Sequence, residues 1–235
     1  MPPSRGPERM VPDLLVTGVR VWSGRGRGLL ALDRLAVPAG QSVAVMGASG
    51  AGKSTLLYVL SGLLPPDEGQ VLWAGQDIAA LNEAGRAAIR RHSFGLVFQD
   101  YHLFEELSAL GNAALAAAFA PRAARAALVA RAGGWLARLG LAGLDARSVA
   151  SCSGGERQRI AVARALACEP PVILADEPTA SLDRAAADAL GADLAQLARA
   201  DGRTLIAVTH DPAFAARLDR RLVIADGRII EDSHD

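Results

Sequence analysis

The sequence predicts an α/β fold in which helices cover a mainly parallel sheet and an all-helical segment interrupts the core. Two observations predict it. Short apolar segments typical of buried strands alternate with helical segments, which is the order of elements in proteins with parallel sheets. Between residues 99 and 151 this alternation stops, and only helical patterns rich in Ala, Leu and Arg remain. Because 51% of the 235 residues are hydrophobic, the chain can bury a packed core.

The first half of the chain is expected to form strands and helices in turn. The expected strands are residues 13–21, 41–46, 71–73 and 95–98, and the expected helices are residues 53–62 and 83–92. The second strand ends at a glycine-rich turn, and residues 65–69, which include Pro65, Pro66 and Gly69, are expected to form a turn.

The second half begins with the helical segment, residues 101–164, with breaks expected at Gly111, Pro121, Gly133 and Gly134, and at residues 140–143. The remaining elements are strands at 172–175 and 204–208, helices at 184–200 and 212–218, and a hairpin at 222–230. We therefore expect a flexible N-terminus (1–12) followed by one domain (13–235). Its core would be residues 13–98 and 165–235, and its helical subdomain would be about residues 100–164.

Composition excludes several classes of protein. The formal net charge is zero, which argues against a broad nucleic-acid-binding surface. Cys152 and Cys168 fit neither a metal site nor a disulfide framework, as expected for reduced thiols in a cytosolic protein. Residues 1–12 lack the apolar core of a signal peptide, and no apolar run approaches the roughly 18–20 residues that span a bilayer. The sequence thus predicts a soluble, cytoplasmic chain.

A phosphate-binding loop follows the second expected strand and opens the next helix. Its residues are Gly47, Ala48, Ser49, Gly50, Ala51, Gly52, Lys53, Ser54 and Thr55. Glycines in this pattern let backbone N–H groups turn toward phosphates, and the helix N-terminus adds a favourable dipole. Lys53 is expected to reach the β- and γ-phosphates, and Ser54 to place its hydroxyl on Mg²⁺. The alternative is a glycine-rich turn with only a structural role.

Lys53 is the only lysine among the 25 cationic residues. Every other positively charged residue is arginine. This position therefore selects the compact ammonium group of lysine, on its flexible side chain, rather than the planar guanidinium group of arginine. Chance is the alternative explanation, but Lys53 lies inside the strongest motif of the chain. ATP with magnesium is therefore the predicted ligand.

Two carboxylates follow the apolar segment 172–175. In an open α/β sheet ligands bind at the carboxyl ends of strands, so Asp176 and Glu177 are expected beside the phosphate loop. Asp176 would hold magnesium, and Glu177 would orient and deprotonate an attacking water. An ordinary acidic strand end is the alternative for the pair taken alone.

Ser153, Gly154, Gly155 and Glu156 open a further helix. Its N-terminus offers free N–H groups and a positive dipole end suited to a γ-phosphate. One chain rarely brings two such termini to one nucleotide, so we expect this one to serve the nucleotide of a neighbouring chain. Taken alone, Ser-Gly-Gly is also a common helix cap.

These motifs together resemble the ATP-binding cassette subunit of ABC transporters. The matching set is the phosphate loop (47–55), Gln99, residues 153–156, residues 174–177, residues 181–183 and His210. The resemblance covers about residues 13–230. It implies a P-loop NTPase core with an N-terminal antiparallel β element and a helical subdomain.

The resemblance also implies roles for single residues. Gln99 would ligate magnesium and sense the γ-phosphate, His210 would contact that phosphate, and Asp183 would lie at a dimer interface. Trp22 falls where the family has an aromatic side chain that stacks on adenine. A tryptophan in the core or on the surface with no ligand is the alternative for Trp22.

Three segments (95–104, 153–159 and 174–183) resemble the branch that includes lipoprotein-releasing and macrolide-export ATPases. Cys152 and Asp100 depart from that branch, which usually has Leu before Ser-Gly-Gly and an aromatic or small residue after the Gln. The resemblance implies an ATPase bound to the inner face of the cell membrane through a transmembrane permease. It would pair with a second copy of itself or a homologous ATPase, and would move lipoprotein, peptide or hydrophobic substrates.

Two alternatives remain within the superfamily. Importer ATPases usually continue into a C-terminal regulatory domain, whereas this sequence stops at Asp235. Soluble cassette ATPases that act on DNA or ribosomes carry coiled coils, zinc sites or two cassettes, which are not visible here. A phosphate-loop kinase is a different class, and the Ser-Gly-Gly helix together with Glu177 argues against it.

Overall fold

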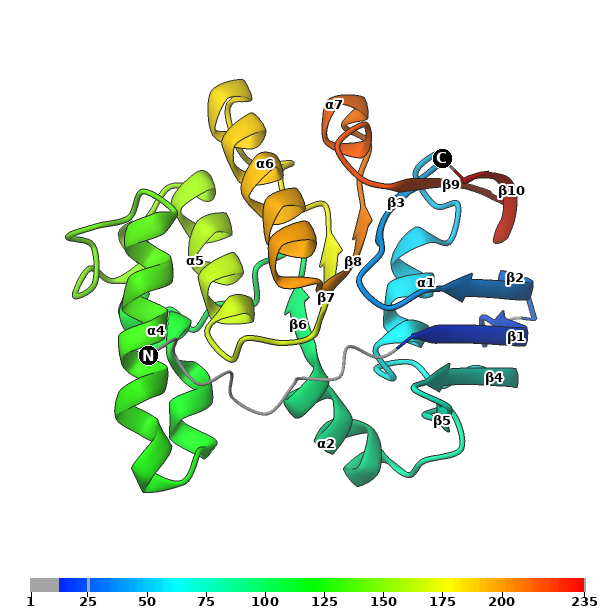
Figure 1. The fold of residues 1–235 in the computed structure, drawn as a ribbon, viewed down its shortest axis with the longest axis horizontal. Helices are drawn as coiled ribbons and strands as arrows, with labels where there is room; N and C mark the ends of the chain where they lie inside the picture. Colours follow the sequence, from blue (N-terminus) through cyan, green and yellow to red (C-terminus); the bar gives the residue numbers. More distant parts are fainter. Residues whose placement is uncertain (1–12, 25, 235) are drawn as a thin grey trace, which may run out of the picture.

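A computed structural model describes residues 13–24 and 26–234. The expected flexible segment 1–12 lies outside these residues. The chain forms two sheets, and Figure 1 shows the smaller, antiparallel one at one end of the molecule and helix α4 (Arg122–Arg138) at the other. The predicted combination of a mainly parallel sheet, an antiparallel β element and a helical segment is confirmed.

The larger sheet has six strands in the order β10-β9-β3-β8-β7-β6. Its strands are β3 (Ser42–Met46), β6 (Phe94–Val97), β7 (Val172–Asp176), β8 (Thr204–Val208), β9 (Arg220–Ala225) and β10 (Arg228–His234). All neighbours pair in parallel except β9 and β10, which form the expected hairpin. Every residue of β7 and β8 is buried, as is typical of strands covered on both faces.

The smaller sheet has the order β2-β1-β4-β5. Its strands are β1 (Leu14–Trp22), β2 (Gly28–Val37), β4 (Glu68–Trp73) and β5 (Gln76–Asp77). No element was predicted for residues 28–37, yet β2 buries Leu30, Leu32, Leu35 and Val37. Charged Asp33 and Arg34 weaken the apolar pattern of β2, and pairing with β1 supplies the hydrogen bonds that make it a strand. Residues 68 and 69, expected in a turn, belong to β4.

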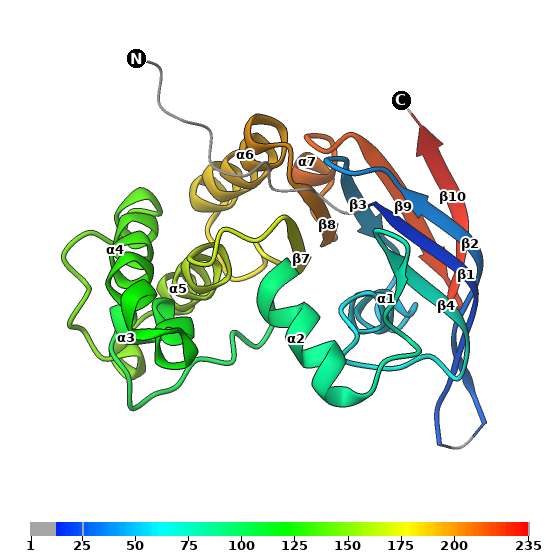
Figure 2. The same ribbon diagram turned by 60° about the horizontal axis from the view of Figure 1, so that its bottom comes forward.

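Strands β3, β6, β7 and β8 of the larger sheet divide their side chains between two cores. Val43 and Val45 pack on the face shared with the smaller sheet and helix α1 (Lys53–Leu60), while Ala44 packs on the opposite face. That opposite core contains helices α5 (Gly154–Leu166) and α6 (Arg184–Asp201). Figure 2 shows α1 between the two sheets, so the helix that follows the phosphate loop is held on both sides.

The remaining helices lie around these cores. They are α2 (Glu83–Ser93), α3 (Ala109–Ala113), η1 (Leu115–Phe119), η2 (Val149–Ser151) and α7 (Pro212–Ala215). Helix α7 is shorter than the helix expected at 212–218. Among the residues that the structure describes, no helix combines the length and hydrophobicity needed to cross a bilayer.

The helical segment differs from the prediction in several places. Gly111, where a break was expected, lies inside α3, and residues 144–153 form turns and η2 rather than a continuous helix. Helix α4 continues through Gly133 and Gly134, where a break was expected, because burial of Ala132 and Leu136 offsets the roughly 1 kcal/mol that each helical glycine costs. Residues 101–108 are not helical. The buried Asn112 side chain binds this loop instead, accepting from the Phe104 N–H at 2.8 Å and donating to the Phe104 carbonyl at 2.9 Å.

Candidate functional site

The phosphate loop connects β3 to α1, and two of its glycines lie too close to neighbouring backbone to carry a side chain. Gly47 has a φ of +148°, and a Cβ there would lie 2.1 Å from the carbonyl oxygen of Ile224. Gly52 has a φ of +103°, and its Cβ would lie 2.6 Å from the carbonyl oxygen of Leu29. The pattern of glycines therefore reflects close contact with the β9 and β2 backbones as well as room for phosphate.

Lys53 lies at the first turn of α1, and its side chain folds back over the loop. The ammonium donates hydrogen bonds to the carbonyl oxygens of Gly47 and Ala48, both at 2.8 Å. Ala51 is buried, and its carbonyl accepts from the Gly227 N–H at 2.9 Å. Hydrogen bonds from the Lys53 side chain and from Gly227 in the β9–β10 turn thus stabilise the conformation of the loop.

One pocket of 310 Å³ brings the predicted catalytic residues together. Residues 47, 49, 50, 53 and 54 of the loop line it, together with Gln99, Asp176, Glu177 and His210. Asp176 ends β7, Glu177 follows it, and Gln99 and His210 follow β6 and β8. The carboxyl ends of these strands share one edge of the parallel sheet. The expectation that these side chains meet beside the phosphate loop therefore agrees with the geometry.

Asp176 is 3% exposed, and its Oδ1 atom is buried without a hydrogen-bond partner in the described part of the chain. Burial raises the pKa of its carboxyl group above the ordinary 3.8, while a hydrogen bond with Ser54 opposes that rise. A buried carboxylate oxygen that lacks a hydrogen-bond donor can bind a cation instead. The hydroxyl, amide and carboxylate oxygens of Ser54, Gln99 and Asp176 are the hard ligands that Mg²⁺ prefers, so these residues fit a magnesium ion.

Glu177 has an unusual backbone conformation for a residue with a side chain, with φ at +48°. Its N–H donates to the Val208 carbonyl at 3.0 Å, which holds this conformation. Its carboxylate lies 2.9 Å from Nδ1 of His210 and accepts from the His210 N–H at 3.4 Å. Such strain in a residue at a pocket is typical of functional sites.

The loop that carries Gln99 is held by contacts from distant segments. Arg164 of α5 donates to the carbonyl oxygens of Tyr101 at 2.6 Å and of His102 at 2.5 Å. The Tyr101 hydroxyl donates to Oγ of Ser181 at 2.6 Å. Gln99 is therefore joined through its loop to α5 and to the segment that precedes Asp183.

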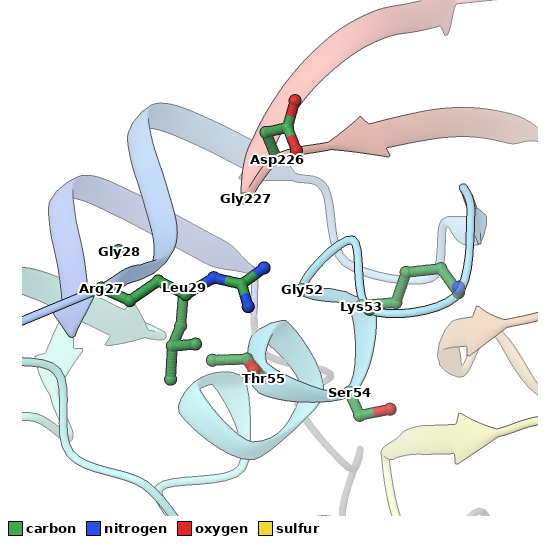
Figure 3. A pocket seen from close by; sticks show the side chains of 10 residues that line it. Arg27, Gly28, Leu29, Gly52, Lys53, Ser54, Thr55, Asp226 and Gly227 are labelled. Carbon is green, nitrogen blue, oxygen red and sulfur yellow. The ribbon is translucent and has the colours of Figure 1, made fainter. Parts of the chain in front are cut away.

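A second pocket, of 430 Å³, lies between the phosphate loop and the β1–β2 and β9–β10 turns (Figure 3). It is lined by Arg27, Gly28, Leu29, Gly50, Gly52, Lys53, Ser54, Thr55, Asp226 and Gly227. The sequence reasoning did not identify Arg27 or Asp226, because both reach the pocket from hairpin turns. The Gly-rich segment 24–28, between two apolar segments, was the available signal for the first hairpin.

Trp22, the predicted adenine contact, ends β1 and is 43% exposed. A position in the core, one of the two alternatives, is thereby excluded. Its side chain is not among the residues that line the second pocket. Its backbone N–H donates to Oδ2 of Asp67 at 2.8 Å, which fixes the end of the strand beside the turn before β4.

The Ser-Gly-Gly segment forms the N-terminus of α5, and none of residues 153–156 lines either pocket. Ser153 and Glu156 cap the helix reciprocally: Ser153 Oγ accepts from the Glu156 N–H at 3.3 Å, and Glu156 Oε2 accepts from the Ser153 N–H at 2.7 Å. Gly154 and Gly155 lie next to Ser181 and Leu182. Asp183 caps α6, accepting from the Ala186 N–H at 3.0 Å.

A phosphate loop, two strand-end carboxylates and a Ser-Gly-Gly helix are the combination of motifs typical of ATP-binding cassettes, and known proteins agree with this class. The family model described as ABC transporter matches residues 32–180. The macrolide export ATP-binding/permease protein MacB 1/2 of Paracoccus denitrificans is 46% identical over 214 residues, which are 89% of this chain and 31% of that protein. MacB 2 of Aeromonas hydrophila is 44% identical over 199 residues, 85% of this chain and 30% of that protein.

Solved structures show the same fold. The dimeric structure of MJ0796, a bacterial ABC transporter cassette, has a TM-score of 0.88 and 32% identity, covering 94% of this chain and 98% of that chain. A dimeric post-hydrolysis state of the same cassette bound to ADP and Pi has a TM-score of 0.87 and 31% identity, with the same coverage.

The chain belongs to the ABC transporter family, and it is an ATP-binding cassette with the ATPase fold of that family. Its sequence is similar to the ATP-binding part of macrolide-export proteins, and the chain spans about a third of the length of these curated relatives.

Proposed function

We propose that this cassette binds Mg²⁺-ATP at the phosphate loop, hydrolyses it with Glu177 as the base, and thereby drives a transmembrane permease. The observation that carries the proposal is the single pocket shared by Lys53, Ser54, Asp176, Glu177 and His210. A phosphate-binding cation, a cation-binding carboxylate and a base meet there, which is the set of groups that phosphoryl transfer to water requires.

Each side chain has a defined task in this proposal. Lys53 leaves the Gly47 and Ala48 carbonyls to bind the β- and γ-phosphate oxygens. Ser54, Gln99 and Asp176 would hold the magnesium ion, which would neutralise charge on the phosphates. Glu177 takes a proton from the attacking water, and His210, which contacts its carboxylate, fixes the orientation of that base and approaches the γ-phosphate.

Two chains complete each site. The α5 N-terminus of one chain would bind the γ-phosphate held by its partner, with Asp183 close to the interface. Support comes from the dimeric state of the two similar solved cassettes and from the absence of residues 153–156 from both pockets of the same chain. A homologous ATPase could replace the second copy.

The permease partner and an export direction are supported by the names of the similar proteins, which are macrolide export ATP-binding/permease proteins. The cassette would lie on the cytoplasmic face of the cell membrane, bound to the permease. Hydrophobic compounds, peptides or lipoproteins are the proposed substrates. The permease, rather than this cassette, would recognise them.

The test is the substitution Glu177→Gln, which keeps the shape and hydrogen bonding of the side chain and removes the base. ATP should still bind, measured by calorimetry, while turnover falls on the order of 10²–10⁴-fold. The matched control is Glu68→Gln, at an exposed position of β4, which should hydrolyse ATP at the wild-type rate. Wild-type turnover by Glu177→Gln would contradict the assignment of the base.

A further inference from the structure

A positively charged side chain, that of Arg27, lines the second pocket, and no motif of the sequence accounts for it. Arg27 precedes β2, in the turn between β1 and β2, and lines this pocket with Gly52 and Thr55. Figure 3 shows its side chain extending from the turn toward the phosphate loop, with the guanidinium group on the loop side.

The backbone of Arg27 is anchored. Its N–H donates to Oγ of Ser23 at 3.2 Å, and its carbonyl accepts from the Ser23 N–H at 2.8 Å. Gly26 donates to the Ser23 carbonyl at 2.8 Å, which closes the turn. The position from which the side chain reaches the pocket is therefore set by hydrogen bonds within the turn.

The Arg27 guanidinium has no carboxylate partner among residues 13–24 and 26–234. Asp226, across the same pocket, makes no ion pair with it. An arginine that faces a pocket without an anion has five N–H donors available, in a fork that matches two phosphate oxygens.

The two pockets share three residues of the loop, Gly50, Lys53 and Ser54. A nucleotide bound across the loop would then place its reacting end beside Glu177 and its other end beside Arg27. Hydrolysis removes the reacting end of ATP, so the end beside Arg27 is the part of the nucleotide that remains in ADP.

We propose that Arg27 binds the phosphates that are retained in the product, the α- and β-phosphates, on the Thr55 side of the loop. This inference rests on the proposed nucleotide site and adds a residue to it. Arg27 then contributes equally to the binding of ATP and ADP and takes no part in the chemical step.

The test compares Arg27→Ala, Arg27→Lys and a matched control, Arg34→Ala, which removes the same charge from an exposed position of β2. Calorimetry with ADP, and with ATP in the Glu177→Gln background, should show about a tenfold higher Kd for both nucleotides in Arg27→Ala. Arg27→Lys should recover part of the loss, and Arg34→Ala should match the wild type. In steady-state hydrolysis the loss should appear in KM rather than in kcat.

Inorganic pyrophosphate, which has no base, distinguishes a phosphate contact from a base contact. A phosphate contact predicts a similar fold-change in Kd with pyrophosphate as with ADP, whereas a loss confined to ADP would show that Arg27 contacts the nucleoside and would overturn the proposal. An unchanged Kd, or a loss with ATP only, would overturn it as well. If the wild-type chain bound no nucleotide, the proposed function itself would fail. An unchanged thermal unfolding midpoint shows that the variants are folded.

Discussion

Lys53 shows how one residue serves the loop in two ways. In this structure its ammonium holds the Gly47 and Ala48 carbonyls, and in the proposed complex the same group turns to the phosphates. A compact ammonium with three donors can make this exchange without moving the backbone. A planar guanidinium is larger and presents its donors in a fixed fork.

We therefore expect Lys53→Ala to weaken ATP binding by about 2–3 kcal/mol, the range for hydrogen bonds to charged groups. Lys53→Arg should also bind poorly, although it keeps the charge. Calorimetric Kd values for the two variants check both expectations. If Lys53→Arg bound ATP as the wild type does, the argument from the shape of the ammonium would be wrong.

At the scale of elements, side chains join segments that are far apart in sequence. Asp219, which follows α7 and precedes β9, accepts hydrogen bonds at Oδ2 from the Ser42 N–H at 2.9 Å and from the Ser42 hydroxyl at 2.6 Å. Arg199 of α6 lies 3.3 Å from the other oxygen. These contacts join the start of β3, helix α6 and the segment between α7 and β9.

These contacts give a pH dependence to the free energy of unfolding. Burial alone would raise the pKa of Asp219, but the hydrogen bonds from Ser42 and the charge of Arg199 outweigh it and hold the pKa below 3.8. Because the folded pKa is lower than the unfolded one, the stabilisation is complete above the ordinary value and is lost as the pH falls through the folded pKa.

Asp219→Asn should therefore reduce the free energy of unfolding at neutral pH by about 1 kcal/mol, since the carboxylate is 37% exposed and solvent screens Arg199. At about pH 3 the difference between the variant and the wild type should shrink. Urea denaturation at the two pH values measures this. A difference that stayed constant with pH would contradict the lowered pKa.

At the scale of the whole molecule, the arrangement of the site predicts that activity requires two chains. The α5 N-terminus and the phosphate loop do not share a pocket within one chain. In a dimer with twofold symmetry, each site would take its loop from one chain and its Ser-Gly-Gly helix from the other.

Mixing a Lys53→Ala chain with a Ser153→Arg chain should then restore some ATPase activity, because one of the two hybrid sites carries neither change. Mixing Lys53→Ala with Glu177→Gln is the matched control. Both of these changes lie on the loop side of a site, so every hybrid site is damaged and no activity should return. Full activity of the wild type in a strictly monomeric sample would contradict the shared site.

Sequence alone determined the parts of the site that are contiguous along the chain. The loop around Lys53 and the pair Asp176 and Glu177 each follow an apolar segment that forms a strand. The carboxyl ends of parallel strands lie at the same edge of the sheet, so these residues come together there. These predictions need only local spacing and the rule that ligands bind at the carboxyl ends of strands. The β2 strand and the continuous α4 helix escaped prediction because pairing and burial outweigh their local patterns.

Only the tertiary structure decided which distant residues complete the site. Arg27 and Asp226 reach one pocket from two hairpins, and Glu177 takes a positive φ because Val208 and His210 hold it. Gly52 must be glycine because Leu29 of β2 lies against it. The physical reason is the same in each case: these contacts join residues that are far apart in the chain, so their energies depend on the packed fold and cannot be derived from local spacing.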